Sequence, residues 1–389
     1  MVNRLLYFMP VCKMKSMKKT SLIISMCLCL CGCAPAGSAV QSALPDETAE
    51  PIPSVQTYHA SLFMVGDALL HDGVYEKGMQ LDGSYDFTSM IHLVKDIAEP
   101  YDLAYYNQES ILGGTELGLS SYPCFNSPKE WGRDMVDAGF NLVSTANNHA
   151  LDKGAEGIQS SLSFWKQEKG VIEDGTYTNH LDQQAIPIHE INGIRYAFIS
   201  YTYGTNGIPL PENQPYLVNT FETDTQPFLD KVKAADSQAD VVIAAVHWGT
   251  EYVNEPTEAQ KALAQQLSDC GADIIIGSHP HVIEPYARIG NAVCFYSLGN
   301  FISSQQGTEK NIGMDAALDI VKTVEDGMTS ISIENVRADL LYCTGYGNAY
   351  EIYPFEQLDD SLLNGHQDLY AQYTGIITEM NDSIRIGGI

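Results

Sequence analysis

Basic residues are scarce in this chain of 389 residues, in which 21 Lys and Arg stand against 49 Asp and Glu and give a formal charge of −28. A protein that binds nucleic acid through a basic surface needs an excess of cations to displace the counterions of the phosphates. The composition therefore excludes a nucleic-acid partner of this kind. With 44% hydrophobic residues, the chain also differs from a disordered acidic tail, and a sizeable packed core is expected.

Cysteine is scarce beyond residue 33, because five of the nine cysteines lie at or before that point. The other four are widely spaced and form no Cys-x-x-Cys pair, which excludes a zinc knuckle and a dense disulfide framework. One or two disulfides and buried free thiols both remain open for these four. They are Cys124, Cys270, Cys294 and Cys343.

The N-terminal 32 residues lack any acidic side chain, and their apolar run, 21–30, lacks the length to span a bilayer as a stable anchor. This pattern predicts an export signal over 1–32, whose removal leaves 16 basic against 49 acidic residues, or −33. The run ends in Leu30-Cys31-Gly32-Cys33, which resembles a bacterial lipobox and predicts lipid attachment at Cys33. A plain secretory signal and a signal-anchor helix are the alternatives.

Residues 33–58 are rich in Ala, Pro, Ser and Glu and lack a sustained apolar period, so they predict a flexible linker from the lipidated cysteine. From residue 59 onward, strand and helix patterns alternate, which predicts an α/β domain over 59–345 with a C-terminal extension, 346–389, packed on it. We expect strands near 62–65, 103–106, 140–145, 241–246 and 273–276, helices starting near 129, 154 and 255, a hairpin over 186–201 with an Asn192-Gly193 turn, and more antiparallel strands at 292–296, 316–321 and 330–333.

Polar side chains follow the ends of five of these strands. Open α/β sheets place ligands outside the carboxyl ends of their strands, so these side chains are expected to meet. Taken singly, each fits a turn or a core position, but their joint placement predicts a metal site. The residues are Asp67, Glu109, Asn147, Asn148, His149, His247, His279 and His281.

The donor types indicate which metal the site takes. Carboxylate, amide and imidazole groups without a thiolate suit Zn, Mn, Fe or a Mg/Mn pair. In an extended segment, His279 and His281 share a face and reach one metal cluster. Two ions about 3.5–4 Å apart can activate water and clamp a phosphoryl or acyl group. Bound cations would also let a domain of −33 charge accept an anionic substrate.

Six motifs in the same order resemble those of the CapA family of capsule (poly-γ-glutamate) synthesis proteins. The resemblance covers about residues 59–305 and implies a four-layer αββα sandwich like that of the metallo-dependent (calcineurin-like) phosphatases. The motifs are Gly66-Asp67, Asn107-Gln108-Glu109, Ala146-Asn-Asn-His149 with Asp152 and Gly154, His247-Trp-Gly-Thr-Glu251, Gly277-Ser-His-Pro-His-Val282 and Ser297-Leu-Gly-Asn-Phe301.

The resemblance also implies a role for each residue, with one or two divalent ions of Zn, Mn or Fe. One ion would be held by Asp67 and His281 and the other by Asn148, His247 and His279, with Glu109 as the bridging carboxylate. His149 would act on the leaving group or the oxyanion, and Asp152 would orient it. Asn147, Glu251, Glu284 and Asn300 are expected to contact substrate, although Glu251 and Glu284 equally fit solvated acids and Asn300 fits a structural turn.

Two departures from the phosphatase pattern bear on the number of metal ions. The phosphatases begin with Asp-x-His, whereas Asp67-Ala68-Leu69 lacks that histidine and His71 lies four residues on. Their Gly-Asp-x-x-Asp motif is replaced by Asn107-x-Glu109.

Together, these features predict a lipid-anchored extracytoplasmic protein with a metal-dependent hydrolase site that acts in capsular poly-γ-glutamate or other surface-polymer biosynthesis. Its expected partners are an anionic surface polymer or phosphoester substrate, other capsule-synthesis membrane proteins and the membrane itself. The alternatives are a non-catalytic polymer-binding or assembly subunit and a secreted metal-dependent phosphoesterase.

Overall fold

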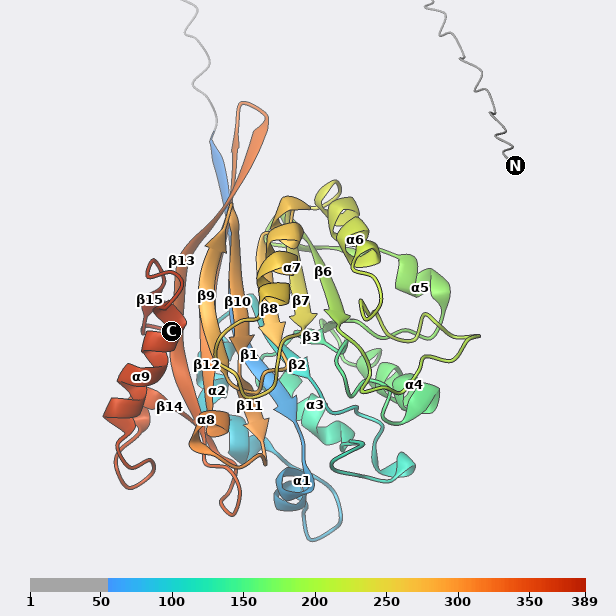
Figure 1. Ribbon diagram of the computed structural model, residues 1–389, viewed down its shortest axis with the longest axis vertical. Helices are drawn as coiled ribbons and strands as arrows, with labels where there is room; N and C mark the ends of the chain where they lie inside the picture. Colours follow the sequence, from blue (N-terminus) through green and yellow to red (C-terminus); the bar gives the residue numbers. More distant parts are fainter. Residues whose placement is uncertain (1–54) are drawn as a thin grey trace, which may run out of the picture. The chain divides into compact units, whose positions relative to one another are not determined.

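The computed structural model describes residues 55–389, which form two β-sheets packed face to face with helices on their outer sides (Figure 1). The predicted four-layer αββα sandwich is confirmed. The predictions for the export signal, for lipid attachment at Cys33 and for most of the linker fall on residues outside the described ones.

The larger sheet has nine strands, in the order β14-β13-β12-β1-β2-β3-β4, with β11 beside β1 and β15 beside β13. Strands β1 to β4 run parallel, and the pairs β1-β12, β12-β13 and β13-β14 are antiparallel, whereas β15 runs parallel to β13. The strands are β1 (Gln56–Leu69), β2 (Leu103–Gln108), β3 (Leu142–Ser144), β4 (Ile172–Asp174), β11 (Asn300–Ser303), β12 (Ile312–Glu325), β13 (Met328–Cys343), β14 (Ile352–Pro354) and β15 (Arg385–Ile386).

The smaller sheet has six strands, in the order β5-β6-β7-β8-β10-β9. The predicted hairpin β5-β6 is confirmed, and its turn residues Asn192 and Gly193 have the positive φ angles, 50° and 83°, that a type I′ turn requires. Strand β10 pairs antiparallel with β9 but parallel with β8, so the antiparallel expectation holds on one side only. The strands are β5 (Ile188–Ile191), β6 (Ile194–Thr202), β7 (Val241–His247), β8 (Ile274–Ser278), β9 (Ile283–Ile289) and β10 (Ala292–Leu298).

Helices cover the outer faces of both sheets. The larger sheet packs against α2, α3 and α4, and the smaller against α6 and α7. None of the helices described in residues 55–389 combines the length and apolarity that a membrane span requires. The helices are α1 (Asp72–Gly78), α2 (Thr88–Ala98), η1 (Thr115–Leu117), α3 (Lys129–Asp137), α4 (Gly154–Trp165), α5 (His180–Gln184), α6 (Gln226–Asp236), α7 (Glu258–Asp269), α8 (Thr308–Asn311), η2 (Phe355–Gln357) and α9 (His366–Thr378).

Apolar side chains on the two faces of β1 belong to two different hydrophobic cores, one between the sheets and one under the helices. Leu62 and Met64 face the smaller sheet, whereas Phe63 and Val65 face the helices, because successive side chains of a strand point to opposite faces. Helix α9 adds Tyr373 to the core between the sheets.

The cysteines in the described part of the chain are all free thiols. Cys294 and Cys343 are buried, whereas Cys124 is exposed. The sequence leaves both disulfides and free thiols open for these cysteines, and the structure contains free thiols.

Gly66 lets β1 pass close to the turn before β11. A Cβ atom at this position would lie 1.8 Å from the carbonyl oxygen of Gly299, which is closer than any real contact. The same oxygen accepts a hydrogen bond of 2.9 Å from the backbone N–H of Asp67. The missing side chain of Gly66 thus fixes the position of Asp67 beside β11.

We expect Gly66→Ala to lower the free energy of unfolding by about 2 kcal/mol or more, because the added methyl group forces the two backbones apart. Gly375→Ala in α9 is the matched control, since its Cβ would meet open space and alanine favours a helix. Urea unfolding followed by circular dichroism measures both changes. Equal stability of the two variants would contradict the close-approach argument.

Candidate metal centre

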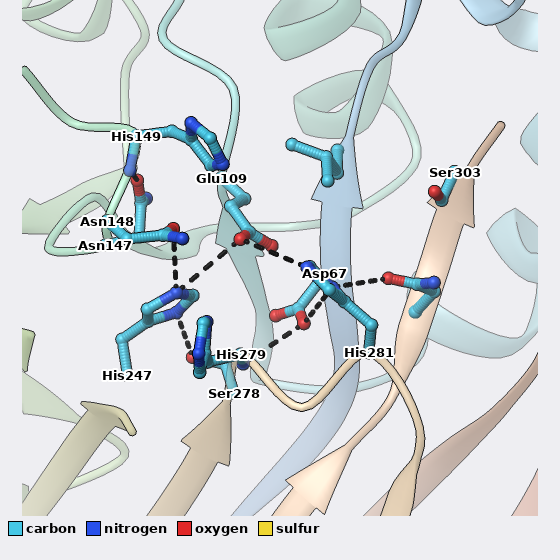
Figure 2. A network of polar contacts seen from close by, with 12 residues as sticks. Asp67, Glu109, Asn147, Asn148, His149, His247, Ser278, His279, His281 and Ser303 are labelled. Carbon is cyan, nitrogen blue, oxygen red and sulfur yellow. Dashed lines mark hydrogen bonds and ion pairs between the residues drawn. The ribbon is translucent and has the colours of Figure 1, made fainter. Parts of the chain in front are cut away.

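The carboxyl ends of strands from both sheets meet at one edge of the sandwich and bring the predicted strand-end residues together (Figure 2). Asp67 lies near the end of β1, Glu109 follows β2, and His247 ends β7. His279 and His281 follow β8. All five side chains are buried, although each is polar or charged.

These residues form two groups that share one carboxylate. Asp67, Glu109 and His281 each offer a ligand atom within 4.8 Å of the others, and so do Glu109, His247 and His279. Asn148 joins the second group, because its Oδ1 atom lies 3.0 Å from His247 Nε2. The structure therefore places all six predicted metal ligands around one point, with Glu109 between the two halves.

Glu109 is the least satisfied side chain of this centre. Both of its carboxylate oxygens are buried without a hydrogen-bond partner. The closest imidazole nitrogens are His247 Nε2 at 3.5 Å and His281 Nε2 at 3.7 Å. An uncompensated buried carboxylate costs several kcal/mol, whereas a divalent cation would neutralise it. The donor set thus fits a metal ion.

The three imidazoles of the centre differ in charge. Burial lowers the pKa of His279 to about 3 and that of His247 well below its usual value, so both rings are neutral and able to bind a metal. Burial acts in the same direction on His281, but Glu109 and Asp67 outweigh it and raise the pKa of His281 to about 9. Near neutral pH, the His281 ring is therefore protonated and lies between the carboxylates of Asp67 and Glu109.

Polar neighbours hold the ligand side chains in place. Ser278 Oγ lies 2.9 Å from His247 Nδ1, so the Nε2 atom of this ring faces Glu109. Asn300 Oδ1 lies 3.0 Å from His281 Nδ1, which is also 3.3 Å from Asp67 Oδ2, and the Nε2 atom of His281 faces Glu109. Asn107 Nδ2 donates to Asp67 Oδ1 at 2.9 Å. Sequence reasoning missed Ser278 and this role of Asn107, because a polar residue at a strand end fits a turn equally well.

The expectation of an extended His279-Pro280-His281 segment is wrong. Both histidines have positive φ angles, 100° and 59°, in the left-handed region that residues with side chains rarely adopt. The backbone N–H of His279 donates to Asp67 Oδ2 at 3.2 Å, which helps to hold this turn. As a result, each histidine joins a different ligand group instead of sharing one face.

His149 lies beside the two ligand groups and is held by three neighbours. Its Nδ1 atom lies 2.7 Å from Asp152 Oδ2, which also accepts from the Phe125 backbone N–H at 2.6 Å. The Phe125 ring packs edge-on against the imidazole, with centroids 4.6 Å apart. Asn147 Oδ1 accepts from the His149 backbone N–H at 3.1 Å. Phe125 was not among the predicted site residues, because it lies in a loop without periodicity.

A cavity of about 470 Å³ opens beside His149 and His281. Of the four predicted substrate contacts, Glu251 lines it, Asn147 lies behind His149, and Asn300 lies behind His281. Glu284 is buried outside the cavity wall and accepts a hydrogen bond of 2.6 Å from Gln260 Nε2 of α7. The wall consists of Leu69, His71, Tyr122, Pro123, Cys124, Phe125, His149, Asp152, Asn206, Ile208, Glu251, Tyr252, His281 and Gln305.

A family model described as bacterial capsule synthesis protein PGA_cap matches residues 61–305. The PGA biosynthesis protein CapA of Bacillus subtilis (strain 168) is 36% identical over 182 residues, which make up 46% of this chain and 47% of that protein. The capsule biosynthesis protein CapA of Bacillus anthracis is 34% identical over 188 residues, 47% of this chain and 45% of that protein. The chain thus spans about half the length of these curated relatives.

Among solved structures, a hypothetical protein from Thermus thermophilus is 19% identical with a TM-score of 0.40, covering 70% of this chain and 98% of that chain.

Glu284 gives a pH-dependent prediction for the region beside the centre. Burial raises the pKa of Glu284 from 4.5 to about 8, so ionisation favours the unfolded chain as the pH rises between these values. Each unit of this shift corresponds to about 1.4 kcal/mol. Glu284→Gln cannot ionise, so we expect it to match the wild type at about pH 4.5 and to be more stable at about pH 8. Urea unfolding at both pH values measures this difference, and a pH-independent effect would contradict it.

Proposed function

The chain belongs to the PGA_cap family of bacterial capsule synthesis proteins, and from that premise we propose that it acts in the biosynthesis of a surface polymer as a metal-dependent hydrolase. Capsular poly-γ-glutamate is the proposed polymer, because the curated relatives are named for PGA and capsule biosynthesis. The family implies a role in the cell envelope.

The observation that carries the proposal is the position of Glu109. Its two buried and unpartnered oxygens face two ligand groups, so one carboxylate can serve a metal ion on either side. Asp67 and His281 would complete one site, and His247 and His279 the other, with the amide oxygen of Asn148. One or two ions of Zn, Mn or Fe would supply Lewis acidity and activate water for attack on a phosphoester or amide bond.

The side chains around the ions would position the substrate and move the proton. The bond to Asp152 fixes the His149 ring through Nδ1 and leaves Nε2 as the nitrogen that can give a proton to the leaving group. The Asp152 carboxylate would stabilise the imidazolium while His149 carries that proton. The edge of Phe125 excludes water from one side of the ring.

We also propose that the mature chain is anchored outside the cytoplasm through lipid on Cys33. The lipobox-like sequence supports this anchor, and residues 34–55 would then separate the lipid from β1, which begins at Gln56. Other capsule-synthesis membrane proteins would be its partners at that surface.

A polymer-binding or assembly subunit without catalysis is the second candidate. Leu69 favours it, because this residue lines the cavity at the position where the phosphatase motif that the chain resembles carries a histidine. A centre with one ligand fewer would bind metal and polymer yet turn over slowly.

We expect metal binding to release a proton. Because Glu109 and Asp67 raise the pKa of His281 to about 9, the incoming ion displaces the proton from that ring, and the affinity rises with pH below this value. Titration calorimetry with Mn²⁺ in buffers of different ionisation enthalpy, at about pH 6 and about pH 8, measures both effects. His247→Ala should weaken binding at least tenfold, while His92→Ala, a half-exposed histidine of α2, serves as the control. Unaltered binding in His247→Ala would contradict the site.

His149→Gln tests catalysis against assembly. A general acid contributes about 10²- to 10⁴-fold, so we expect a loss of this size in the hydrolysis of phosphoester or γ-glutamyl test substrates, with Mn²⁺ binding unchanged. Capsule yield in a cell carrying this variant, at normal protein level, is the second measurement. Lost polymer supports a hydrolase, whereas retained polymer with the wild-type amount of protein favours the assembly subunit.

A further inference from the structure

The wall of the cavity beside His149 and His281 carries two carboxylates and no Lys or Arg side chain among the residues that the structure describes. The carboxylates belong to Glu251 and Asp152. Lys310 lies over the ring of Tyr252, with Nζ 4.7 Å from the ring centre, but the same Nζ is 3.0 Å from Glu309 Oε1 and its charge is already paired. A ligand that carries many negative charges therefore finds no free basic side chain on this wall.

Asp152 offers an acceptor that its own neighbours leave unused. Its Oδ2 atom is occupied by His149 and the Phe125 backbone, but its Oδ1 atom is buried and has no hydrogen-bond partner. The Glu251 carboxylate lies on the same wall. An ionised carboxylate only accepts hydrogen bonds, so both groups call for O–H or N–H donors on the ligand.

Aromatic rings supply the rest of the recognition surface. Tyr122 and Tyr252 line the cavity and are 78% and 47% exposed, so a ligand can contact the Tyr122 ring and the part of the Tyr252 ring that Lys310 leaves uncovered. The Tyr252 hydroxyl accepts from Gln305 Nε2 at 3.2 Å, and its backbone N–H donates to Pro280 at 2.8 Å. Tyr252 is thereby tied to the turn that holds the metal-ligand histidines.

We propose that the cavity binds a neutral, hydroxyl-rich glycosyl group of the substrate, an inference that rests on the proposed metal-dependent hydrolase. The hydroxyl groups of a sugar would donate to Glu251 and Asp152, and its apolar C–H face would pack on the tyrosine rings. The scissile phosphoester would be the only charged part of the substrate and would lie over the two ligand groups.

The same wall disfavours a γ-glutamyl chain. Such a chain carries a carboxylate on each residue, and these would face Glu251 and Asp152 without a Lys or Arg side chain on the wall to compensate them. Only the carboxylate or phosphate next to the ions would be matched in charge. The cavity therefore favours the sugar-linked phosphoester over the γ-glutamyl chain.

Calorimetric titration of the Mn²⁺-loaded protein tests this inference. The probes are the neutral trisaccharides maltotriose, cellotriose and triacetylchitotriose, and a γ-glutamyl trimer as the anionic ligand. We expect at least one trisaccharide to bind at least tenfold more tightly than the γ-glutamyl trimer. Tyr122→Ala should weaken trisaccharide binding at least tenfold, whereas Leu181→Ala in α5, a side chain that is 79% exposed, should leave it unchanged. Glu251→Lys should reverse the preference toward the γ-glutamyl trimer.

Mn²⁺ uptake is measured on the same samples, so the metal site and the glycosyl site can be contradicted independently of each other. Normal uptake without trisaccharide binding overturns the glycosyl inference and leaves the metal site intact. Trisaccharide binding without Mn²⁺ uptake overturns the metal-dependent hydrolase and keeps the glycosyl site. Equal or tighter binding of the γ-glutamyl trimer, or wild-type affinity in Tyr122→Ala, also overturns the glycosyl inference.

Discussion

The buried carboxylate of Glu109 is the constraint on which the centre depends. Removing a carboxylate from water is costly unless a partner replaces the lost hydration, and neither oxygen of Glu109 has a hydrogen-bond donor among the described residues. The imidazoles of His247 and His281 lie within 3.7 Å of Glu109, but both rings also contact other polar side chains, Ser278 and Asn300. A divalent cation on either side of Glu109 would compensate this cost, so metal binding would also stabilise the fold.

The packing of the two sheets places the Glu109 carboxylate between two groups of candidate metal ligands. Asp67 and Glu109 lie at the ends of parallel strands of the larger sheet, and His247 and the His279 turn lie at the ends of parallel strands of the smaller sheet. All of them lie at one edge of the sandwich. The face-to-face packing of apolar side chains from both sheets fixes the distance between these sets. Close backbone approaches such as that of Gly66 to Gly299 set the final position of Asp67.

Much of this architecture could be predicted from the sequence, because apolar runs that end in polar residues mark both the strands and their functional edge. The turn of His279 and His281 could not, since its left-handed backbone depends on a contact with Asp67, which is distant in the chain. The loop that carries Phe125 over His149 has no periodicity. Glu284 follows the histidine motif in sequence, yet β9 directs it toward α7.

Crystals grown with Mn²⁺ and measured at the manganese absorption edge would test the central role of Glu109 most directly. We expect one or two anomalous peaks in contact with the Glu109 carboxylate, beside Asp67 and His281, beside His247 and His279, or at both places. The absence of any peak in contact with Glu109, at a Mn²⁺ concentration that saturates other sites in the crystal, would contradict the role of this carboxylate as a bridging ligand.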